Sequence, residues 1–538
     1  MKNIKKYIKN IVFKYSNYYY KNLNIFFLIL IVISLPLSEF LLSVSIIALM
    51  INYILSPDLK TRLKKIYKRK SVLAIILIYL LHIIGLIYSS NLQYGLHDLK
   101  IKITLPVLAI ILGTGEFPNE KELKLIMKFF ILALIVASII SFLVYIGVIK
   151  REIKDIRQIS IYISHIRFSL LINVGIFYIL YRLLNNENLK PIIFYILSLI
   201  WLIIFLFILQ SLTGILIFII LSVIFVFKYL IKINNKKLIT STFTFLFLTL
   251  LIIGIYVYKS VKKFYTINEN TNQVLEQYTL NGNKYYHDTL NKDIENGYYI
   301  WRYICDEELQ KQWQKKSNLS YWGKDLKNQD LRTTLIRYMT SKGLRKDSAG
   351  FVQLTDNDIK NIENGMANYV FSKKLSIYPR IYEFLWEIEA IKKNINPSGH
   401  SLLQRIEFLK TAFSIISKNI FIGVGTGDVD DAFKTEYRIL KSRLEPKYWL
   451  RAHNQLITFI LTFGIIGFIF IISCFTFAIV YEKKHKDFLF MFFITIAFIS
   501  FLNEDTLETH TGMSFFAFFL SLFLFRKNNQ KQDEKIGS

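Results

Sequence analysis

The stretch Arg451–Gly467, R-A-H-N-Q-L-I-T-F-I-L-T-F-G-I-I-G, joins a long polar region to an apolar run. That apolar run is longer than the ~20 residues with which a helix crosses a bilayer. The pair His453-Asn454 stands at the junction, and Gly464 and Gly467 follow inside the run. We therefore expect the chain to hold His453 at the surface of a membrane.

The rest of the chain shows the same alternation of polar and apolar segments. Of its 538 residues, 53% are hydrophobic, which exceeds the apolar share of an ordinary soluble domain. The apolar residues form blocks of bilayer-crossing length, so the sequence predicts an all-α polytopic membrane protein. Much of the net charge of +28 lies in short segments between the blocks, where basic residues orient membrane helices. We expect membrane lipids as partners and no nucleic acid.

The blocks predict about twelve transmembrane helices. Two basic segments, residues 1–23 and Lys60–Lys70, flank a helical hairpin that breaks near Pro36, which places both segments in the cytoplasm. Both termini are then cytoplasmic. The expected parts are a cytoplasmic N-terminus (1–23), transmembrane helices one to nine (24–258), one large, mainly helical external domain (259–452), transmembrane helices ten to twelve (453–525) and a cytoplasmic tail (526–538).

The end of the expected external domain, residues 397–427, has the clearest local pattern. Ser401-x-x-Gln404 predicts a capping box at a helix start. The residues after it repeat at helical spacing and predict an apolar stripe, with Arg405 off the stripe. Gly423-Val-Gly425-Thr-Gly427 predicts a tight turn, since glycine adopts the positive φ that such a turn needs. It does not fit a dinucleotide fingerprint, which needs a preceding strand and another glycine spacing. The stripe residues are Leu402, Ile406, Leu409, Phe413 and Ile416.

The junction at His453 has chemical consequences. We expect His453 or Asn454 to begin the apolar helix, and a helix N-terminus carries partial positive charge and free N–H groups. This environment disfavours a protonated imidazole, so we expect a neutral His453 that can accept a proton. It also favours a phosphate group nearby. A lone histidine at a membrane boundary is equally compatible with an interfacial polar residue, and the junction by itself leaves both interpretations open.

Three motifs together resemble the O-antigen ligase and polymerase superfamily. They are R-I-E-F-L-K-T-A-F from Arg405, N-I-F-I-G-V-G-T-G-D from Asn419, and R-x-H-N from Arg451 with the later G-I-I-G. The expected topology is also similar, with a large external loop before the helix that bears the histidine. The resemblance implies glycan transfer from an undecaprenyl-pyrophosphate carrier at the periplasmic face of the bacterial cytoplasmic membrane, without metal or other cofactor. The 259–452 domain would then be periplasmic.

The resemblance also implies roles for individual residues. His453 matches the family histidine that would deprotonate the acceptor hydroxyl. Arg405 matches a family arginine, and its planar fork suits a pyrophosphate leaving group. The alternative for Arg405 is a helix-surface ion pair with Glu407 or Glu436.

A second family arginine, in an S-R-G pattern, is missing, because the matching segment here is Ser211-Leu-Thr-Gly214. We expect Arg167 to take its place, with help from Arg151 or Arg157 in a basic external loop. The alternative is that Arg167 pairs with a carboxylate or with backbone carbonyls. Four residues are expected to support the site: Asn454, Arg451, His165 and Ser211.

Other polar and aromatic residues leave alternatives open. Glu504, Asp505 and Glu508 lie in the last external loop, where they would steer the acceptor or pair with the arginines. No metal-ligand pattern stands out, so we expect no metal. Aromatic rings can stack on sugars, but we expect the tryptophans to build the domain core or to contact lipid headgroups, with Trp449 near His453 as the exception. The tryptophans of the expected external domain are Trp301, Trp313, Trp322, Trp386 and Trp449.

The resemblance therefore implies a metal-independent, inverting glycosyltransferase of the ligase type, with lipid A-core or a similar glycan as acceptor. The first alternative is a polymerase of O-antigen or exopolysaccharide that joins repeat units. A protein O-oligosaccharyltransferase and a polysaccharide exporter or flippase are less favoured. The sequence shows no internal repeat of the kind that many transporters have.

Overall fold

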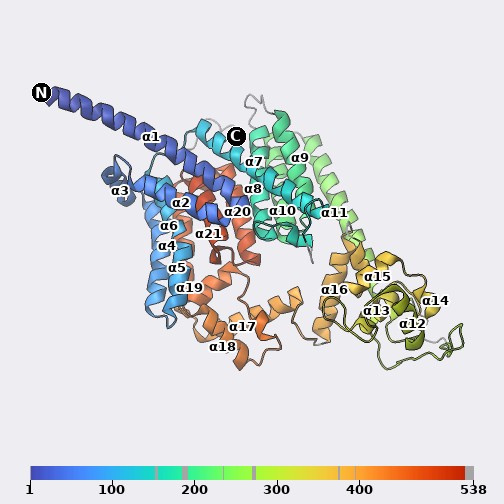
Figure 1. Ribbon diagram of the computed structural model, residues 1–538. Coiled ribbons are helices and arrows are strands. Elements are labelled where there is room, and N and C mark those ends of the chain that lie inside the picture. The colour runs from blue at the N-terminus through green and yellow to red at the C-terminus, as the bar shows by residue number, and fades with distance from the viewer. Residues whose placement is uncertain are drawn as a thin grey trace. The chain divides into compact units, whose positions relative to one another are not determined.

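The computed structural model describes residues 2–151, 156–184, 192–233, 236–268, 274–373, 376–393 and 395–526 (Figure 1). Within these ranges the regular structure is almost entirely helical, which confirms the predicted class. The single small sheet there pairs β1 (Ile294–Glu295) with β2 (Tyr298–Tyr299). The chain forms two compact units, unit 1 (Met1–Asn235 with Pro397–Ser538) and unit 2 (Lys236–Asn396). Residues 397–452 thus group with the apolar helices of unit 1.

Unit 1 brings the two ends of the sequence into one apolar core. Helix α19 packs on α4, α21 on α6, and α20 on α8 (Figure 1). The N-terminal helices are α1 (Lys2–Leu37), α2 (Glu39–Ile54), α3 (Leu59–Lys68), α4 (Lys70–Ile87), α5 (Leu92–Lys102), α6 (Thr104–Thr114), α7 (Glu120–Tyr145), α8 (His165–Leu184), α9 (Ile192–Ile208) and α10 (Leu212–Ile233), with the 3-10 turn η1 (Ile156–Ile159). The C-terminal helices are α17 (Ser401–Lys418), α18 (Val429–Ile439), α19 (Gln455–Tyr481), α20 (Phe488–Asn503) and α21 (His510–Leu524), with the 3-10 turns η3 (Pro446–Tyr448), η4 (Lys484–Lys486) and η5 (Thr506–Glu508).

Several helices are long and apolar enough to cross a membrane, as an integral membrane protein requires. Among the described residues, five pass on length and composition: residues 18–37 of α1, and α4, α7, α8 and α19. The pair α2 and α3, bent by 102°, makes a sixth if it is one span. Four shorter apolar helices accompany them: α9, most of α10, α20 and α21. The total of about twelve spans and the side of each loop stay predictions.

Local signals explain several helix ends. Ser38 caps α2 by accepting from Leu41 N, which gives the break expected near Pro36. Asn454 caps α19 by accepting from Ile457 N at 3.0 Å. The capping box predicted at Ser401 is wrong, because Ser401 is already the first helical residue and its N-cap, His400, makes no side-chain cap bond.

The apolar stripe predicted on α17 is not the face that the protein buries. Ile406 and Phe413 are exposed, while the buried face carries Leu403, Phe408 and Ile415. Helical spacing identifies apolar faces, but both faces of α17 hold apolar residues, so spacing alone does not choose the packed one.

A kink in α19 receives the glycine-rich turn. Gly464 interrupts the helix at φ 64°, which leaves the carbonyls of Leu461 and Thr462 without their usual helical partners. The N–H groups of Val424 and Gly425 donate to these carbonyls at 2.9 Å each. The close approach explains the glycines, because a Cβ on Gly464 would lie 2.1 Å from the Phe421 carbonyl oxygen. The sequence predicted the turn correctly, and the structure shows that it docks on the helix behind His453.

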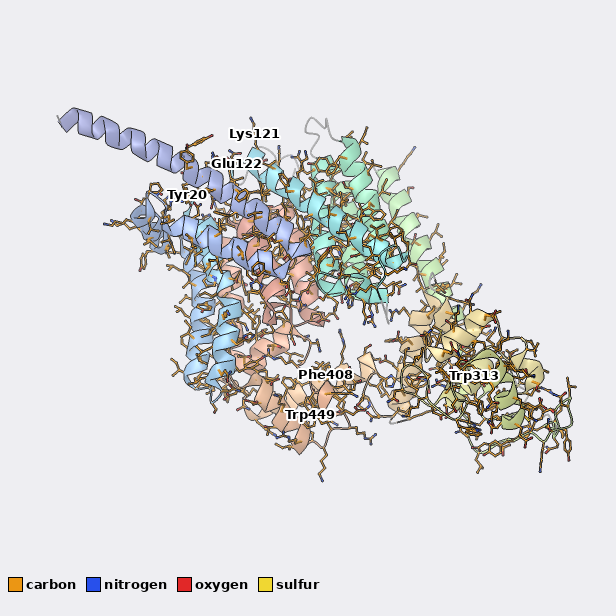
Figure 2. The ribbon with its side chains drawn as sticks, viewed as in Figure 1. Tyr20, Lys121, Glu122, Trp313, Phe408 and Trp449 are labelled. Atoms are coloured by element: carbon orange, nitrogen blue, oxygen red, sulfur yellow. The ribbon has the colours of Figure 1, made fainter. Side chains whose placement is uncertain are left out.

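Unit 2 is a separate helical body with its own core. Trp313 and Tyr338 are completely buried in it, and Figure 2 marks Trp313. Helix α11 packs against α16. The helices are α11 (Lys236–Tyr265), α12 (Asp306–Lys316), α13 (Leu331–Ser341), α14 (Ser348–Phe351), α15 (Asp356–Glu363) and α16 (Tyr378–Lys392), with the 3-10 turn η2 (Tyr369–Ser372).

Candidate functional site

His453 lies in the turn immediately before α19. Its backbone has φ 49°, a left-handed conformation that is uncommon outside glycine. Two bonds hold this turn, one to the α20–α21 loop and one to the end of α20. The His453 N–H donates to Asp505 Oδ2 at 3.1 Å, and the Asn454 side chain donates to the Leu502 carbonyl at 3.0 Å. Strained backbone of this kind persists where neighbouring contacts fix it, and it is frequent at functional sites.

The imidazole of His453 is set between a carboxylate and an aromatic ring. Its Nδ1 lies 3.5 Å from Glu504 Oε2, and its ring centroid lies 5.5 Å from that of Phe408 on α17. The side chain is about one-third exposed, at 32%. An imidazole that donates from Nδ1 to Glu504 presents Nε2 as a proton acceptor, the arrangement that a general base needs.

The shift in the pKa of His453 runs opposite to the one expected from the helix N-terminus. The Glu504 carboxylate, as a hydrogen-bond partner, raises the pKa of His453 above its ordinary value, although burial and the nearby Arg405 oppose this shift. An opposite charge at contact range outweighs the partial charge of a helix end. His453 is therefore a stronger base than the sequence indicated, and a larger share of it is protonated at a given pH.

Arg405 reaches the same carboxylate from the first turns of α17. Its guanidinium lies 3.2 Å from Glu504 Oε1, while His453 faces the other oxygen, Oε2. The alternative partners do not engage it, since Glu436 bonds Lys418 and Glu407 accepts from a serine hydroxyl. Glu504 thus joins the two residues that the sequence singled out. The Arg405 side chain remains 39% exposed, so part of its fork is available to a ligand.

The other two acids of the loop hold the site together. Asp505 accepts from the Thr458 hydroxyl at 2.8 Å as well as from the backbone of His453. Burial and the neighbouring Glu508 raise the pKa of Asp505. Burial also acts on Glu508, but Lys102 and Arg451 outweigh it and keep the pKa of Glu508 below its ordinary range. Of these two acids, Glu508 pairs with an arginine, Arg451, whereas Asp505 bonds the backbone of His453 and the Thr458 hydroxyl.

Arg451 belongs to this paired network. It bonds Glu508 at 2.9 Å and also bonds the Tyr94 hydroxyl on α5. Lys102 bridges Glu508 at 2.9 Å and Asp98 at 2.5 Å. Arg451 therefore connects the turn of His453 to α5, and its predicted supporting role is structural in the first instance.

The three residues expected from the earlier helices have different surroundings. Arg167 lies in the first turn of α8, 3.2 Å from the Ser164 hydroxyl, and the Glu504 and Glu39 carboxylates act on it electrostatically. His165 begins the same helix. Ser211 is buried and bonds the Ser169 hydroxyl at 3.0 Å, so it fastens the start of α10 to α8.

Arg151 and Arg157 flank residues 152–155, which lie outside the described residues. Their expected help to Arg167 stays a prediction.

The tryptophan nearest the site serves packing. The indole of Trp449 stacks on Tyr437 with centroids 5.5 Å apart and donates to the Leu444 carbonyl. Trp449 and Phe408, both marked in Figure 2, belong to one apolar cluster with α18. This cluster contacts the ring of His453 through Phe408.

Sequence reasoning did not identify Glu504 as the partner of His453, nor Lys102 and Gln455 as partners of Glu508. One signal was present, because three acids in a short loop between two apolar runs demand partners or water. In the part of the chain that the structure describes, no three His, Cys, Asp or Glu side chains are grouped as metal ligands would be.

Residues 351–472 match the family model described as "O-Antigen ligase". No curated protein matches the chain. The matched range contains Arg405, the glycine-rich turn, His453 and the kink at Gly464, while Glu504 lies outside it.

Proposed function

We propose that this chain, which belongs to the O-antigen ligase superfamily, is a membrane glycosyltransferase that moves a glycan from undecaprenyl-pyrophosphate to an acceptor hydroxyl. The acceptor is lipid A-core or a similar glycan, and the reaction takes place at the periplasmic face of the bacterial cytoplasmic membrane. The observation that carries the proposal is the arrangement of His453 and Arg405 on the two oxygens of Glu504.

In the proposed reaction His453 Nε2 removes the proton of the acceptor hydroxyl. The oxygen then attacks the anomeric carbon from the face opposite the pyrophosphate, and the bond from that carbon to the pyrophosphate oxygen breaks. The product has inverted configuration, the proton stays on His453, and the negative charge leaves with the polyprenyl pyrophosphate. Glu504 stabilises the imidazolium that forms, as a carboxylate does in a hydrolase triad.

Arg405 stabilises the leaving pyrophosphate. Its guanidinium carries a fixed positive charge and presents N–H groups in a fork that matches phosphate oxygens. Arg167 assists in place of the arginine missing from Ser211–Gly214. The mechanism needs no metal, because the arginines meet the developing charge.

The experiment is transfer by purified protein from a lipid-linked glycan to lipid A-core. His453→Ala at normal protein level should give no product, and product at the wild-type rate would overturn the proposal. A deletion strain separates the two reactions of the family. Polymer that accumulates on the carrier and is absent from lipid A-core indicates a ligase, and a product one repeat unit long indicates a polymerase.

A further inference from the structure

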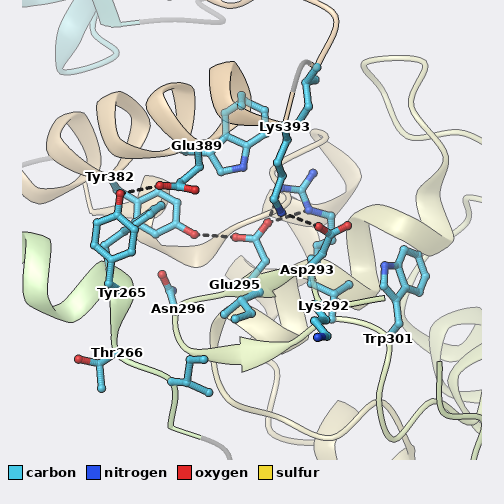
Figure 3. Close-up of a pocket in the computed structure, with 18 residues that line it drawn as sticks. Tyr265, Thr266, Lys292, Asp293, Glu295, Asn296, Trp301, Tyr382, Glu389 and Lys393 are labelled. Carbon is cyan, nitrogen blue, oxygen red and sulfur yellow. Dashed lines mark hydrogen bonds and ion pairs between the residues drawn. The ribbon is translucent and has the colours of Figure 1, made fainter. Parts of the chain in front are cut away.

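Unit 2 contains a cavity of about 470 Å³ that the site around His453 does not use. It lies among the end of α11, the β1–β2 pair and α16 (Figure 3). Its size falls in the range of small-ligand sites. Every residue that lines it belongs to unit 2, so unit 2 alone forms it.

The cavity is lined by equal numbers of basic and acidic side chains. The bases that line it are Lys292, Arg337 and Lys393, and the acids are Asp293, Glu295 and Glu389. Two of the bases are already paired across the cavity. Lys393 lies 2.9 Å from Asp293, and Arg337 pairs with Glu295. A site for phosphate or another anion needs unbalanced positive charge, so this balance favours an uncharged ligand.

The floor of the cavity, formed by Glu295, is buried, whereas its rim, formed by Asp293 and Lys393, is half exposed. Glu295 is buried, and its carboxylate accepts from Arg337, from Asn368 at 2.6 Å and from Tyr382 at 2.8 Å. Asp293 and Lys393 are half exposed, at 50% and 53%. Figure 3 shows this pair beside Glu295, with Tyr265 and Glu389 at the other end. The rim groups can exchange hydrogen bonds with a ligand without breaking the buried floor.

Aromatic side chains complete the lining. Trp301 and Trp386 are half buried, and Tyr265 is exposed by 49%. Trp301 also packs on the core of unit 2, which fixes its ring beside the cavity. The two cavity tryptophans contrast with Trp313, which is fully buried and only builds the core. Half-buried aromatic faces offer a flat apolar surface, while the rim offers hydroxyl and carboxylate partners.

We propose that this cavity is a second carbohydrate site, which holds sugar residues of the glycan that the enzyme transfers or extends. Sugars combine apolar C–H faces with uncharged hydroxyls, and the cavity combines aromatic faces with balanced, paired polar groups. A lipid tail would leave the charged rim unsatisfied, and an anion would find no net positive charge. The source of the saccharide rests on the proposed function, whereas the binding itself does not need His453.

The test uses full-length protein purified in detergent. The probe is the repeat-unit oligosaccharide released by mild acid from the polyprenyl-linked glycan of the same cells, and its affinity is measured by calorimetry. We expect saturable binding, weakened about tenfold by Trp386→Ala through loss of the aromatic surface. Asp293→Ala, a half-exposed rim change, should also weaken it. Trp322→Ala is the matched control, because Trp322 is 59% exposed in the same unit and does not line the cavity.

The outcomes separate this proposal from the proposed function. Unchanged oligosaccharide affinity in His453→Ala supports a site independent of the chemistry, even if that variant fails to transfer. A Trp386→Ala enzyme should show a raised KM for the glycan with an unchanged kcat, as loss of uniform binding predicts. Absence of saturable binding by the wild type, or equal affinities of Trp386→Ala and Trp322→Ala, would overturn the second site. Retained transfer by His453→Ala would instead remove the proposed reaction and leave the binding result standing.

Discussion

The Glu504 carboxylate lies 3.5 Å from Nδ1 of His453, although the two residues come from different loops of unit 1. The same carboxylate holds Arg405 through its other oxygen. A single acid therefore links the proposed base to the proposed pyrophosphate ligand. One oxygen of this carboxylate faces the imidazole and the other the guanidinium, so a pyrophosphate on Arg405 would compete with Glu504 for that guanidinium.

Replacement of His453 by alanine should lower transfer by about 10²–10⁴-fold, the contribution of a positioned general base. The measurement is the initial rate with lipid-linked donor at equal protein level. His485→Ala is the control, because His485 lies in the separate turn η4 and should transfer normally. A His453→Ala enzyme as active as His485→Ala would contradict the assignment.

The pH dependence of transfer tests the His453–Glu504 pair. Because Glu504 raises the pKa of His453, the neutral imidazole becomes the major form only at a pH above the ordinary histidine value of 6.5. The rate should therefore rise with pH through a midpoint above that value. The same pairing stabilises the fold at low pH and loses this contribution as pH rises through the raised pKa.

Glu504→Gln should shift this midpoint to lower pH, since the amide carries no charge to favour imidazolium. Its maximal rate should also fall, because the imidazolium formed in the reaction is no longer stabilised. Glu407→Gln is the matched control, as Glu407 lies on α17 near Arg405 but bonds the Ser442 hydroxyl. An unmoved midpoint in Glu504→Gln would show that another group controls the profile.

Arg405→Lys separates charge from geometry at the pyrophosphate. Lysine keeps the positive charge but loses the planar fork, so we expect transfer to fall about 10²-fold, as when one stabilising donor is removed. Initial rates over a range of donor concentrations check this. Arg380→Lys is the control, because Arg380 pairs with Glu383 on α16 in unit 2. Equal rates for the two variants would mean that Arg405 serves only its ion pair with Glu504.

Local patterns predicted the elements, and their limits are visible at particular residues. The apolar blocks located the helices because bilayer-crossing length is a property of sequence alone. The start of α19 was predicted at His453 or Asn454, and Asn454 is its N-cap, since capping depends on nearby residues. The packed face of α17 was not predictable, since Ile406 and Phe408 are both apolar and only tertiary contacts bury one of them.

Glu504 shows why the site was only half predicted. His453 and Arg405 stood in motifs, but their shared partner lies beyond α20, in a loop whose approach depends on how three helices pack. The protonation of His453 followed from that missing contact, so a local argument from the helix end gave the wrong direction.

The kink in α19 gives a prediction about stability. Gly464→Ala places a Cβ 2.1 Å from the Phe421 carbonyl oxygen, at a φ of 64° that alanine resists. We expect the free energy of unfolding to fall by about 1–3 kcal/mol, because the glycine-rich turn is displaced from the carbonyls that it caps. Thermal unfolding of the purified protein, followed by tryptophan fluorescence, measures the change. Gly254→Ala is the matched control, because Gly254 lies in α11 with no atom within 4 Å of an added Cβ. The free energy of unfolding of that variant should stay the same or rise by about 0.5–1 kcal/mol. Transfer should fall in Gly464→Ala but not in Gly254→Ala, since α17, which carries Arg405, leads directly into the displaced turn. A Gly464→Ala protein with wild-type unfolding and transfer would show that the kink is not needed to position the site.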